Sequence, residues 1–367
     1  MINKIVKYGI VGIGGMGSNH AKTILSNTVT NASLEGVCDL NMKYKENFPQ
    51  VLFYNNIHEF FNNKNIEAVI IATPHDSHVP LAIQSLKNGK HTIVEKPLAV
   101  TANNCKKLIE VANNCNASFG VMLNQRTIPI YKKLKKIIDD NQLGKIHRIH
   151  WTITDWLRTN YYYKISDWRA KWSGEGGGVL INQSIHQLDL WQWLFGLPES
   201  VYTRLKLGRF HEIEVEDDVT SFLKYKNGAH GIFVTTTGES PGINRLEIAG
   251  ENGLIVVENN KIIFNINETP SSDYIKNSKT LFEFPANSVE KYEYVDEILG
   301  GHENIIQNFT NHILGKEKLF VDGREGIHSV ELINAMIYSG LNNVEVELPI
   351  NGKKYENKIN EMISNSL

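Results

Sequence analysis

The chain is poor in cysteine. It has only Cys38, Cys105 and Cys115, and no two of them form a C-x-x-C pair. Such an odd, scattered set argues against a disulfide framework and against a thiolate metal site. Long apolar runs are also missing, since no stretch approaches the roughly 18 residues needed to cross a bilayer. The N-terminus carries neither a long apolar segment nor a small-residue cleavage site. We therefore expect a cytoplasmic protein with no membrane partner.

A charge imbalance is absent as well. The 367 residues include 38 Lys and Arg against 40 Asp and Glu, a formal net charge of -2, and the two signs are mixed along the chain. Without a basic block, we expect no nucleic-acid partner. Hydrophobic residues make up 41% and charged residues 21%, the balance of an ordinary globular protein. The length exceeds that of one compact domain, which predicts two domains.

A glycine-rich turn follows the first predicted strand, residues 5–11. Gly12, Gly14 and Gly17 form G-x-G-x-x-G, with Gly15 and Met16 between them, and residues 18–25 have helical spacing of apolar side chains. In this strand–turn–helix setting the glycines permit a tight turn, close approach of a pyrophosphate and close packing of the helix. The helix N-terminus offers N–H groups to phosphates. Taken alone, the pattern also fits a glycine-rich surface turn.

An acidic residue at the end of the second predicted strand supports the dinucleotide interpretation. Residues 34–39 end in Asp39, which lies 22 residues after Gly17. A carboxylate there can accept hydrogen bonds from the adenine ribose and would repel a 2′-phosphate. The pattern predicts NAD as cofactor and disfavours NADP, although Asn41 and Lys43 nearby would soften the repulsion.

Alternation of strands and helices continues to residue 126, the predicted end of a Rossmann domain over residues 1–126. Predicted strands at 68–72, 91–94 and 117–122 lead into 73–78, 95–97 and 124–126. Ligands in such sheets bind beyond the carboxyl ends of the strands. The predicted cofactor contacts are Gly12, Gly14, Gly15, Met16, Gly17, Asp39, Thr73, Pro74, His75, His78, Glu95, Lys96 and Asn124. Lys96 alone fits a solvated lysine equally well, and the convergence of five segments on one edge favours a functional role.

Residues 127–367 show a different pattern, and we expect them to form a substrate-binding α+β domain. Alternating runs at 146–153, 200–206, 219–225, 231–237, 245–249, 253–258 and 261–265 predict an open, mostly antiparallel sheet. Helices are expected near 179–195, 299–314 and 323–340. The predicted fold class is α/β, with an N-terminal Rossmann domain and a C-terminal α+β domain.

Two segments of this second domain are chemically dense. The first predicts contacts with a sugar through aromatic stacking and arginine hydrogen bonds, although a packing patch under a long loop fits equally well. Its candidates are Asp155, Arg158, Tyr162, Trp168 and Arg169. The second segment has glycines at 176–178 before a predicted helix whose face carries Asn182, His186 and Asp189. A single helical histidine is usually structural, but the glycines and the polar neighbours favour a functional His186.

Histidine pairs raise the alternative of a metal site. His147 and His150 lie three apart in a predicted strand and so face opposite sides. His75 and His78 lie in the proposed cofactor loop, where a role near nicotinamide is simpler. We expect no metal.

These motifs together resemble the Gfo/Idh/MocA oxidoreductases, the family of glucose-fructose oxidoreductase and inositol dehydrogenase. The resemblance covers nearly the whole chain. It rests on Gly12-x-Gly14-x-x-Gly17, Ala72-Thr73-Pro74-x-x-x-His78, Glu95-Lys96-Pro97, Gly176-Gly177-Gly178 through His186 to Asp189, and the segments 321–326 and 346–349.

The resemblance implies a dehydrogenase that moves a hydride between nicotinamide and a secondary hydroxyl or ketone of a sugar, glycoside or cyclitol. Lys96 and His186 would be the catalytic pair, and both would contact substrate together with Arg126 and Asn182. His186 would take the hydroxyl proton, and Lys96 would stabilise the oxygen. The resemblance also implies homodimers or homotetramers formed through the sheet face.

One position departs from the inositol-type pattern, which usually has Asp four residues before the histidine, where this chain has Asn182. This puts inositol in doubt as substrate and favours a hexose, a glycoside or a related polyol. Two alternatives remain open: an NAD-dependent glycosidase that oxidises its substrate transiently, and a non-catalytic NAD or sugar sensor. The presence of both Lys96 and His186 speaks against the sensor.

Overall fold

The structure is a computed structural model that describes residues 4–294 and 301–366, and its chain divides into two compact units. Unit 1 comprises the described residues of 1–127, 174–176 and 300–330, and unit 2 those of 128–173, 177–299 and 331–367. Residues 127–367 were all expected to belong to the second domain. Two later segments instead return to unit 1, because tertiary packing that local periodicity does not reveal places Ile305, Ile306 and Phe309 in the same apolar core as Val6 and Tyr8.

Unit 1 contains a parallel sheet of six strands in the order β3-β2-β1-β4-β5-β6. The strands are β1 (Val6–Val11), β2 (Ala32–Cys38), β3 (Leu52–Tyr54), β4 (Ala68–Ile71), β5 (His91–Val94) and β6 (Phe119–Val121). All of β4 is buried, as its continuous apolar run requires in a sheet covered on both faces. The sequence predicted each of these strands except β3, which has only three residues.

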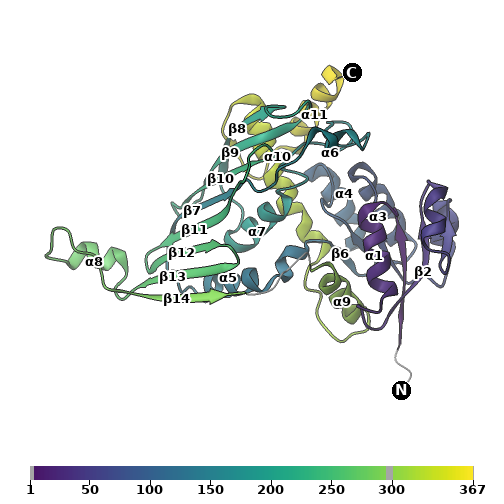
Figure 1. Ribbon diagram of the computed structural model, residues 1–367, viewed down its shortest axis with the longest axis horizontal. Coiled ribbons are helices and arrows are strands. Elements are labelled where there is room, and N and C mark those ends of the chain that lie inside the picture. The colour runs from purple at the N-terminus through teal and green to yellow at the C-terminus, as the bar shows by residue number, and fades with distance from the viewer. Residues whose placement is uncertain (1–3, 295–300, 367) are drawn as a thin grey trace. The chain divides into compact units, whose positions relative to one another are not determined.

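Short connections and helices complete unit 1 (Figure 1). The helices are α1 (Gly15–Leu25), α2 (Ile57–Asn62), α3 (His78–Lys87), α4 (Ala102–Asn113) and α9 (His302–Ile313). The 3₁₀ turns are η1 (Met42–Asn47), η2 (His75–Ser77), η3 (Asn124–Thr127) and η4 (Gly323–Glu325). Because every strand is parallel, the segments that follow β1, β2, β4, β5 and β6 leave the same edge of the sheet, as the sequence predicted.

Unit 2 contains a sheet of nine strands in the order β14-β13-β12-β11-β7-β10-β9-β8-β15 (Figure 1). The strands are β7 (Ile146–Ile153), β8 (Ser200–Leu207), β9 (Glu216–Lys224), β10 (His230–Thr236), β11 (Asn244–Gly250), β12 (Gly253–Glu258), β13 (Lys261–Asn267), β14 (Asn287–Glu293) and β15 (Val346–Glu347). Neighbours are antiparallel except β7 and β10. The mostly antiparallel sheet was predicted, whereas β14, which is almost fully exposed, and β15, which has two residues, were not.

Helices pack on one face of this sheet. They include α5 (Pro129–Asp139), α7 (Ile185–Phe195) and α10 (Gly326–Asn342), whose residues from Glu331 onward belong to unit 2. A Cβ on Gly231 of β10 would lie 2.5 Å from the Trp191 ring of α7, so this glycine admits the indole against the strand. The remaining helices of unit 2 are α6 (Asn160–Lys164), α8 (Ser271–Asn277) and α11 (Gly352–Ser366).

One predicted helix begins later than expected. The sequence predicted a helix from residue 179, but α7 starts at Ile185 and residues 179–184 form turns. Asn182 therefore precedes the helix, and it does not share a helical face with His186 and Asp189. The side chain and backbone of Glu216 accept hydrogen bonds from the amides of Gly178, Val179 and Leu180, which fixes this segment of turns to β9 ahead of the helix.

Candidate active site

The glycine turn of unit 1 has the geometry that a dinucleotide requires. Gly12 has φ +86°, in the left-handed region that favours glycine, and a Cβ on Gly17 would lie 1.7 Å from the Gly12 carbonyl oxygen. By contrast, a Cβ on Gly14 or Gly15 would meet nothing within 4 Å. The backbone at the N-terminus of α1 is thus approachable, and its first amides can receive a pyrophosphate.

Asp39, directly after β2, is bound to this turn. Its Oδ2 accepts a hydrogen bond from the Ile13 amide at 2.7 Å, and its Oδ1 accepts one from the Asn41 amide at 2.8 Å. A carboxylate has about four lone-pair sites, so both oxygens retain acceptor capacity for ribose hydroxyls. Asp39 can therefore shape the glycine turn and also face the ribose, and only the second role was predicted.

The loop after β4 contains two buried histidines. The nitrogens of His78 lie 2.8 Å from the Pro97 oxygen and 2.9 Å from the Thr73 oxygen, so its ring joins the loops after β4 and β5. The Nδ1 of His75 lies 3.1 Å from the Glu175 oxygen. Burial lowers the pKa of both histidines, whereas for His78 the two carbonyl oxygens act to raise it. The geometry thus shows His78 contacting both loops, and its contact with the cofactor stays a prediction.

Glu95 and Lys96 follow β5 at the same edge. Glu95 is buried, and its Oε1 lies 2.6 Å from the Nε2 of His20 in α1. Burial acts to raise the pKa of Glu95, but the hydrogen bond from His20 and the positive charges of His20, His302 and Lys96 together lower it to about 2. Lys96 is half-buried. Sequence reasoning missed His20, although it lies three residues after Gly17 on the apolar face of α1.

Two predicted ligand-contacting residues follow β6. Asn124 is 3% exposed, and its Oδ1 has no hydrogen-bond partner within 4–294 and 301–366. A buried acceptor of this kind suits a ligand N–H group. Arg126 is 1% exposed and pairs with Glu325. The substrate contact expected of Arg126 stays a prediction.

In unit 2, the structure brings together several of the predicted sugar-binding residues. The Tyr162 ring lies 5.1 Å from the Arg158 guanidinium and 4.6 Å from that of Arg169. The amide of Asn182 lies 3.5 Å from the Tyr162 hydroxyl, and Arg169 lies 5.4 Å from the Trp168 ring. Asp155 lies two residues after β7, and partial desolvation of its carboxyl raises its pKa.

The three-glycine segment is shaped by Glu216 of β9. The Glu216 Oε1 accepts hydrogen bonds from the amides of Gly178 at 2.9 Å and Leu180 at 3.2 Å. A Cβ on Gly178 would lie 1.9 Å from the Glu216 carbonyl oxygen, so only glycine allows this approach. The turn leads into the first helical turn of α7, where His186 is half-buried. Glu216 was not predicted, because its role depends on a contact between distant segments.

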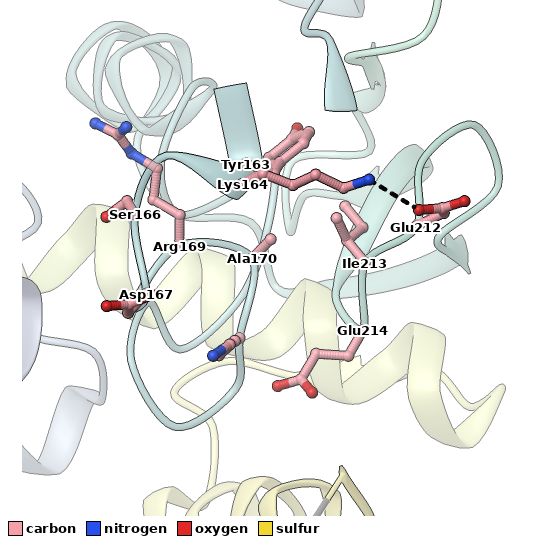
Figure 2. Close-up of a pocket in the computed structure, with 10 residues that line it drawn as sticks. Tyr163, Lys164, Ser166, Asp167, Arg169, Ala170, Glu212, Ile213 and Glu214 are labelled. Carbon is pink, nitrogen blue, oxygen red and sulfur yellow. Dashed lines mark hydrogen bonds and ion pairs between the residues drawn. The ribbon is translucent and has the colours of Figure 1, made fainter. Parts of the chain in front are cut away.

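A pocket lies beside the predicted sugar-binding segment in unit 2 (Figure 2). Its lining comes from residues 163–171 and 212–214, and Lys164 reaches across it to Glu212 at 3.3 Å. In Figure 2 the Arg169 side chain extends away from Lys164 and Glu212. Arg169 is the one predicted substrate contact in the lining, so we do not assign the substrate to this pocket.

Within the described ranges, no group of three or more His, Cys, Asp or Glu side chains is arranged to hold a metal ion. In the same part of the chain, no helix combines the length and the apolar character needed to cross a membrane. Lys96 belongs to unit 1 and His186 to unit 2, and their catalytic pairing is a prediction.

Two family descriptions match the chain. Residues 6–123 match the oxidoreductase family with an NAD-binding Rossmann fold, and residues 131–256 match the GFO/IDH/MocA C-terminal domain. These two matches fall on the parallel sheet of unit 1 and on the central strands of unit 2.

Individual proteins are similar over different shares of the chain. The inositol 2-dehydrogenase of Salmonella typhimurium is 30% identical over 52% of this chain, and the alignment spans about half, 54%, of that protein. The myo-inositol 2-dehydrogenase of Thermotoga maritima is 23% identical over 88% of this chain and 92% of that protein.

A solved structure is similar over nearly the whole chain. The WlbA dehydrogenase of Bordetella pertussis, in complex with NADH and UDP-GlcNAcA, is 25% identical and covers 95% of this chain and 100% of its own, with a TM-score of 0.79. Together with the two family matches, this shows that the chain belongs to the Gfo/Idh/MocA family of NAD-binding oxidoreductases.

Proposed function

We propose that this protein is an NAD-dependent dehydrogenase or reductase acting on a secondary hydroxyl or ketone of a sugar, glycoside or cyclitol. The observation that carries the proposal is the position of Lys96. It follows β5 at the sheet edge that also carries the glycine turn and Asp39, next to the buried Glu95. A lysine held at that edge is well suited to act beside a bound nicotinamide.

Three parts of unit 1 would bind the cofactor: the glycine turn, Asp39 and Asn124. The turn from Gly12 to Gly17 and the first amides of α1 would hold the pyrophosphate, and Asp39 would bind the ribose. The buried, unpartnered Oδ1 of Asn124 would accept a hydrogen bond from the cofactor. When bound, NAD supplies the nicotinamide that accepts or returns a hydride.

Side chains of the protein would transfer the proton of the substrate hydroxyl and stabilise the negative charge on its oxygen. His186 would take the proton of the substrate hydroxyl as it is oxidised, and return it in the reverse direction. The Lys96 ammonium would orient the same oxygen and stabilise its negative charge. Asn182, as an amide, would hold substrate by hydrogen bonds but could not replace His186 as a base.

The substrate class is argued from the residues around Tyr162. Arg158 and Arg169 lie on its ring, and Asn182 approaches its hydroxyl, so aromatic and charged groups are clustered beside α7. Such a cluster suits a sugar ring bearing hydroxyl or carboxylate groups. The relatives named above are called inositol dehydrogenases, and WlbA was crystallised with UDP-GlcNAcA. We infer a hexose, glycoside or related polyol.

An assembly of identical chains is proposed through the uncovered face of the unit 2 sheet. Leu223 of β9 lies on the face that Trp191 covers, so the neighbouring Phe222 points to the other face, where it is 46% exposed. Its ring stacks on His230 at 5.8 Å and 15°. Arg148, Glu247, Arg245 and Glu258 form ion pairs on β7, β11 and β12. We infer a homodimer or homotetramer.

The test of the function is a screen for NADH formation with hexoses, glycosides, inositols and nucleotide sugars. We expect at least one of these to be oxidised with NAD faster than with NADP. A substrate that is turned over without added NAD and without net NADH formation would instead indicate a glycosidase. No NAD binding and no turnover of any kind would contradict the proposal.

A further inference from the structure

His20 is a buried histidine that the proposed reaction does not use. It lies on α1, the helix that begins at the glycine turn, and it is 0% exposed. Its Nε2 lies 2.6 Å from the Glu95 Oε1, whereas its Nδ1 has no hydrogen-bond partner among the residues for which the structure gives positions. The hydrogen bond to Glu95 is therefore the one polar contact that explains a histidine here.

Glu95 in turn contacts the backbone of Lys96. Its second oxygen, Oε2, accepts a hydrogen bond from the Lys96 amide at 3.1 Å. The carboxylate thus connects two elements: His20 on the dinucleotide-binding helix and the backbone of the lysine after β5. We name this connection the His20–Glu95 clamp.

A carboxylate buried in this way is costly unless it is hydrogen-bonded and compensated by positive charge. The titratable and charged groups that act on Glu95 come from several elements: His20 on α1, His75 and His78 on η2 and α3, Lys96 after β5, and His302 on α9. The His302 ring also lies 5.5 Å from the His20 ring. Among these groups, His20 makes a side-chain hydrogen bond to Glu95, so the loss of His20 should affect the carboxylate most.

We propose that His20 is a positioning residue for Lys96, which it holds through Glu95, so that the helix receiving the dinucleotide also fixes the backbone of the catalytic lysine. The role assigned to Lys96 rests on the proposed function, whereas the clamp itself does not. The clamp links α1, which begins at the glycine turn, to the backbone of Lys96 after β5. Both elements belong to unit 1.

Two measurements on the free protein test the clamp without cofactor or substrate. The first follows the Glu95 carboxyl carbon by NMR in protein labelled at glutamate, with Glu95→Gln identifying the resonance. The second follows hydrogen exchange of the Lys96 amide relative to that of Ile93 in β5. The variants are His20→Ala, which removes the donor, and His20→Gln, whose amide can still donate from the same position. Tyr8→Phe is the matched control, because it removes another buried hydrogen bond of unit 1, the one to Thr310.

We expect His20→Ala to raise the titration midpoint of Glu95 by at least ~1 pH unit, because both its hydrogen bond and its charge are lost. Exchange of the Lys96 amide should rise at least ~10-fold relative to Ile93. His20→Gln should restore the slow exchange of the Lys96 amide and the part of the midpoint shift that comes from the hydrogen bond, and Tyr8→Phe should change neither quantity. If His20→Ala does not fold, His20→Asn replaces it, since its shorter amide cannot reach Glu95.

An unchanged Glu95 midpoint, or equal exchange changes at Lys96 and Ile93, would overturn the clamp. If both shifts occur but wild-type protein forms no NADH with any substrate, the proposed function fails while the clamp stands. If wild-type protein is active and neither shift occurs, the clamp fails alone.

Discussion

At the scale of single residues, two carboxylates place negative charge at the edge of the parallel sheet where the dinucleotide is expected to bind. Asp39 accepts the Ile13 amide and so places a negative charge beside the glycine turn. Glu95 is buried, bound by His20, and adjacent to Lys96. Each carboxylate accepts a hydrogen bond within unit 1 and also carries a negative charge. Replacing either one by its amide removes the charge and keeps an oxygen that can accept the hydrogen bond.

Asp39→Asn removes the charge and keeps one oxygen acceptor. We expect the ratio of NAD to NADP affinity to fall at least ~10-fold, because repulsion of the 2′-phosphate is lost. Titration of each cofactor into the protein measures the ratio. Asp139→Asn, an exposed change on α5, should leave it unaltered. An unchanged ratio in Asp39→Asn would mean that another residue selects the cofactor.

Glu95 should make stability depend on acid pH. Its pKa is lowered from 4.5 to about 2 in the folded state, so between these values the unfolded chain binds more protons than the folded one. The stabilisation is therefore present above about pH 4.5 and is lost as the pH falls toward 2. Thermal unfolding midpoints across this range should fall less steeply in Glu95→Gln than in the wild type. Parallel slopes for the two proteins would contradict this assignment.

Single residues also show where sequence reasoning ends. Lys96, Asp39 and the glycines were identifiable because strand ends and turn chemistry leave local patterns. His20 and Glu216 were not, since their partners lie far away in the chain. The ion pair between Arg126 and Glu325 in η4 was not predicted either, because no spacing reveals it.

At the scale of elements, glycine is required at two positions where one backbone segment passes very close to another. Gly17 allows α1 to pass the Gly12 carbonyl, and Gly178 allows the turn before α7 to pass the backbone of β9. The sequence located both glycine segments correctly. It placed the start of α7 too early, because the contacts of residues 178–180 with Glu216 join segments far apart in the chain and leave no local pattern.

Gly17→Ala should disrupt the dinucleotide turn, because its Cβ would lie 1.7 Å from a backbone oxygen. We expect the thermal midpoint to fall by about 5 °C or more and NADH binding to be lost. The matched variant is Gly15→Ala, whose Cβ would meet nothing within 4 Å, and its midpoint should equal that of the wild type. Equal midpoints for all three proteins would show that the turn adapts.

At the scale of the whole molecule, the fold class followed from the sequence because each unit has its own periodicity. Continuous apolar runs alternate with helices in unit 1, and two-residue alternation marks the sheet of unit 2. The return of residues 301–330 to unit 1 was not predictable, because a helix pattern does not indicate which core the helix joins.

The proposed assembly predicts a change in size for one surface variant. Phe222→Asp places a charge on the uncovered face of β9 and should shift a homodimer or homotetramer toward smaller species in light scattering. Leu52→Asp, on the edge strand β3, is an exposed change in the other unit and should leave the mass unaltered. A wild-type mass equal to one chain would exclude the assembly.

The central claim is that Lys96 acts on a sugar or polyol oxygen beside NAD. It is tested most directly by the rate of NADH formation with the best substrate of the screen, in the wild type and in Lys96→Ala. Lys87→Ala, at the end of α3, serves as the control lysine. We expect Lys96→Ala to lower turnover at least ~100-fold, because charge stabilisation at the reacting oxygen is lost. Turnover in Lys96→Ala close to that of the wild type would contradict the account.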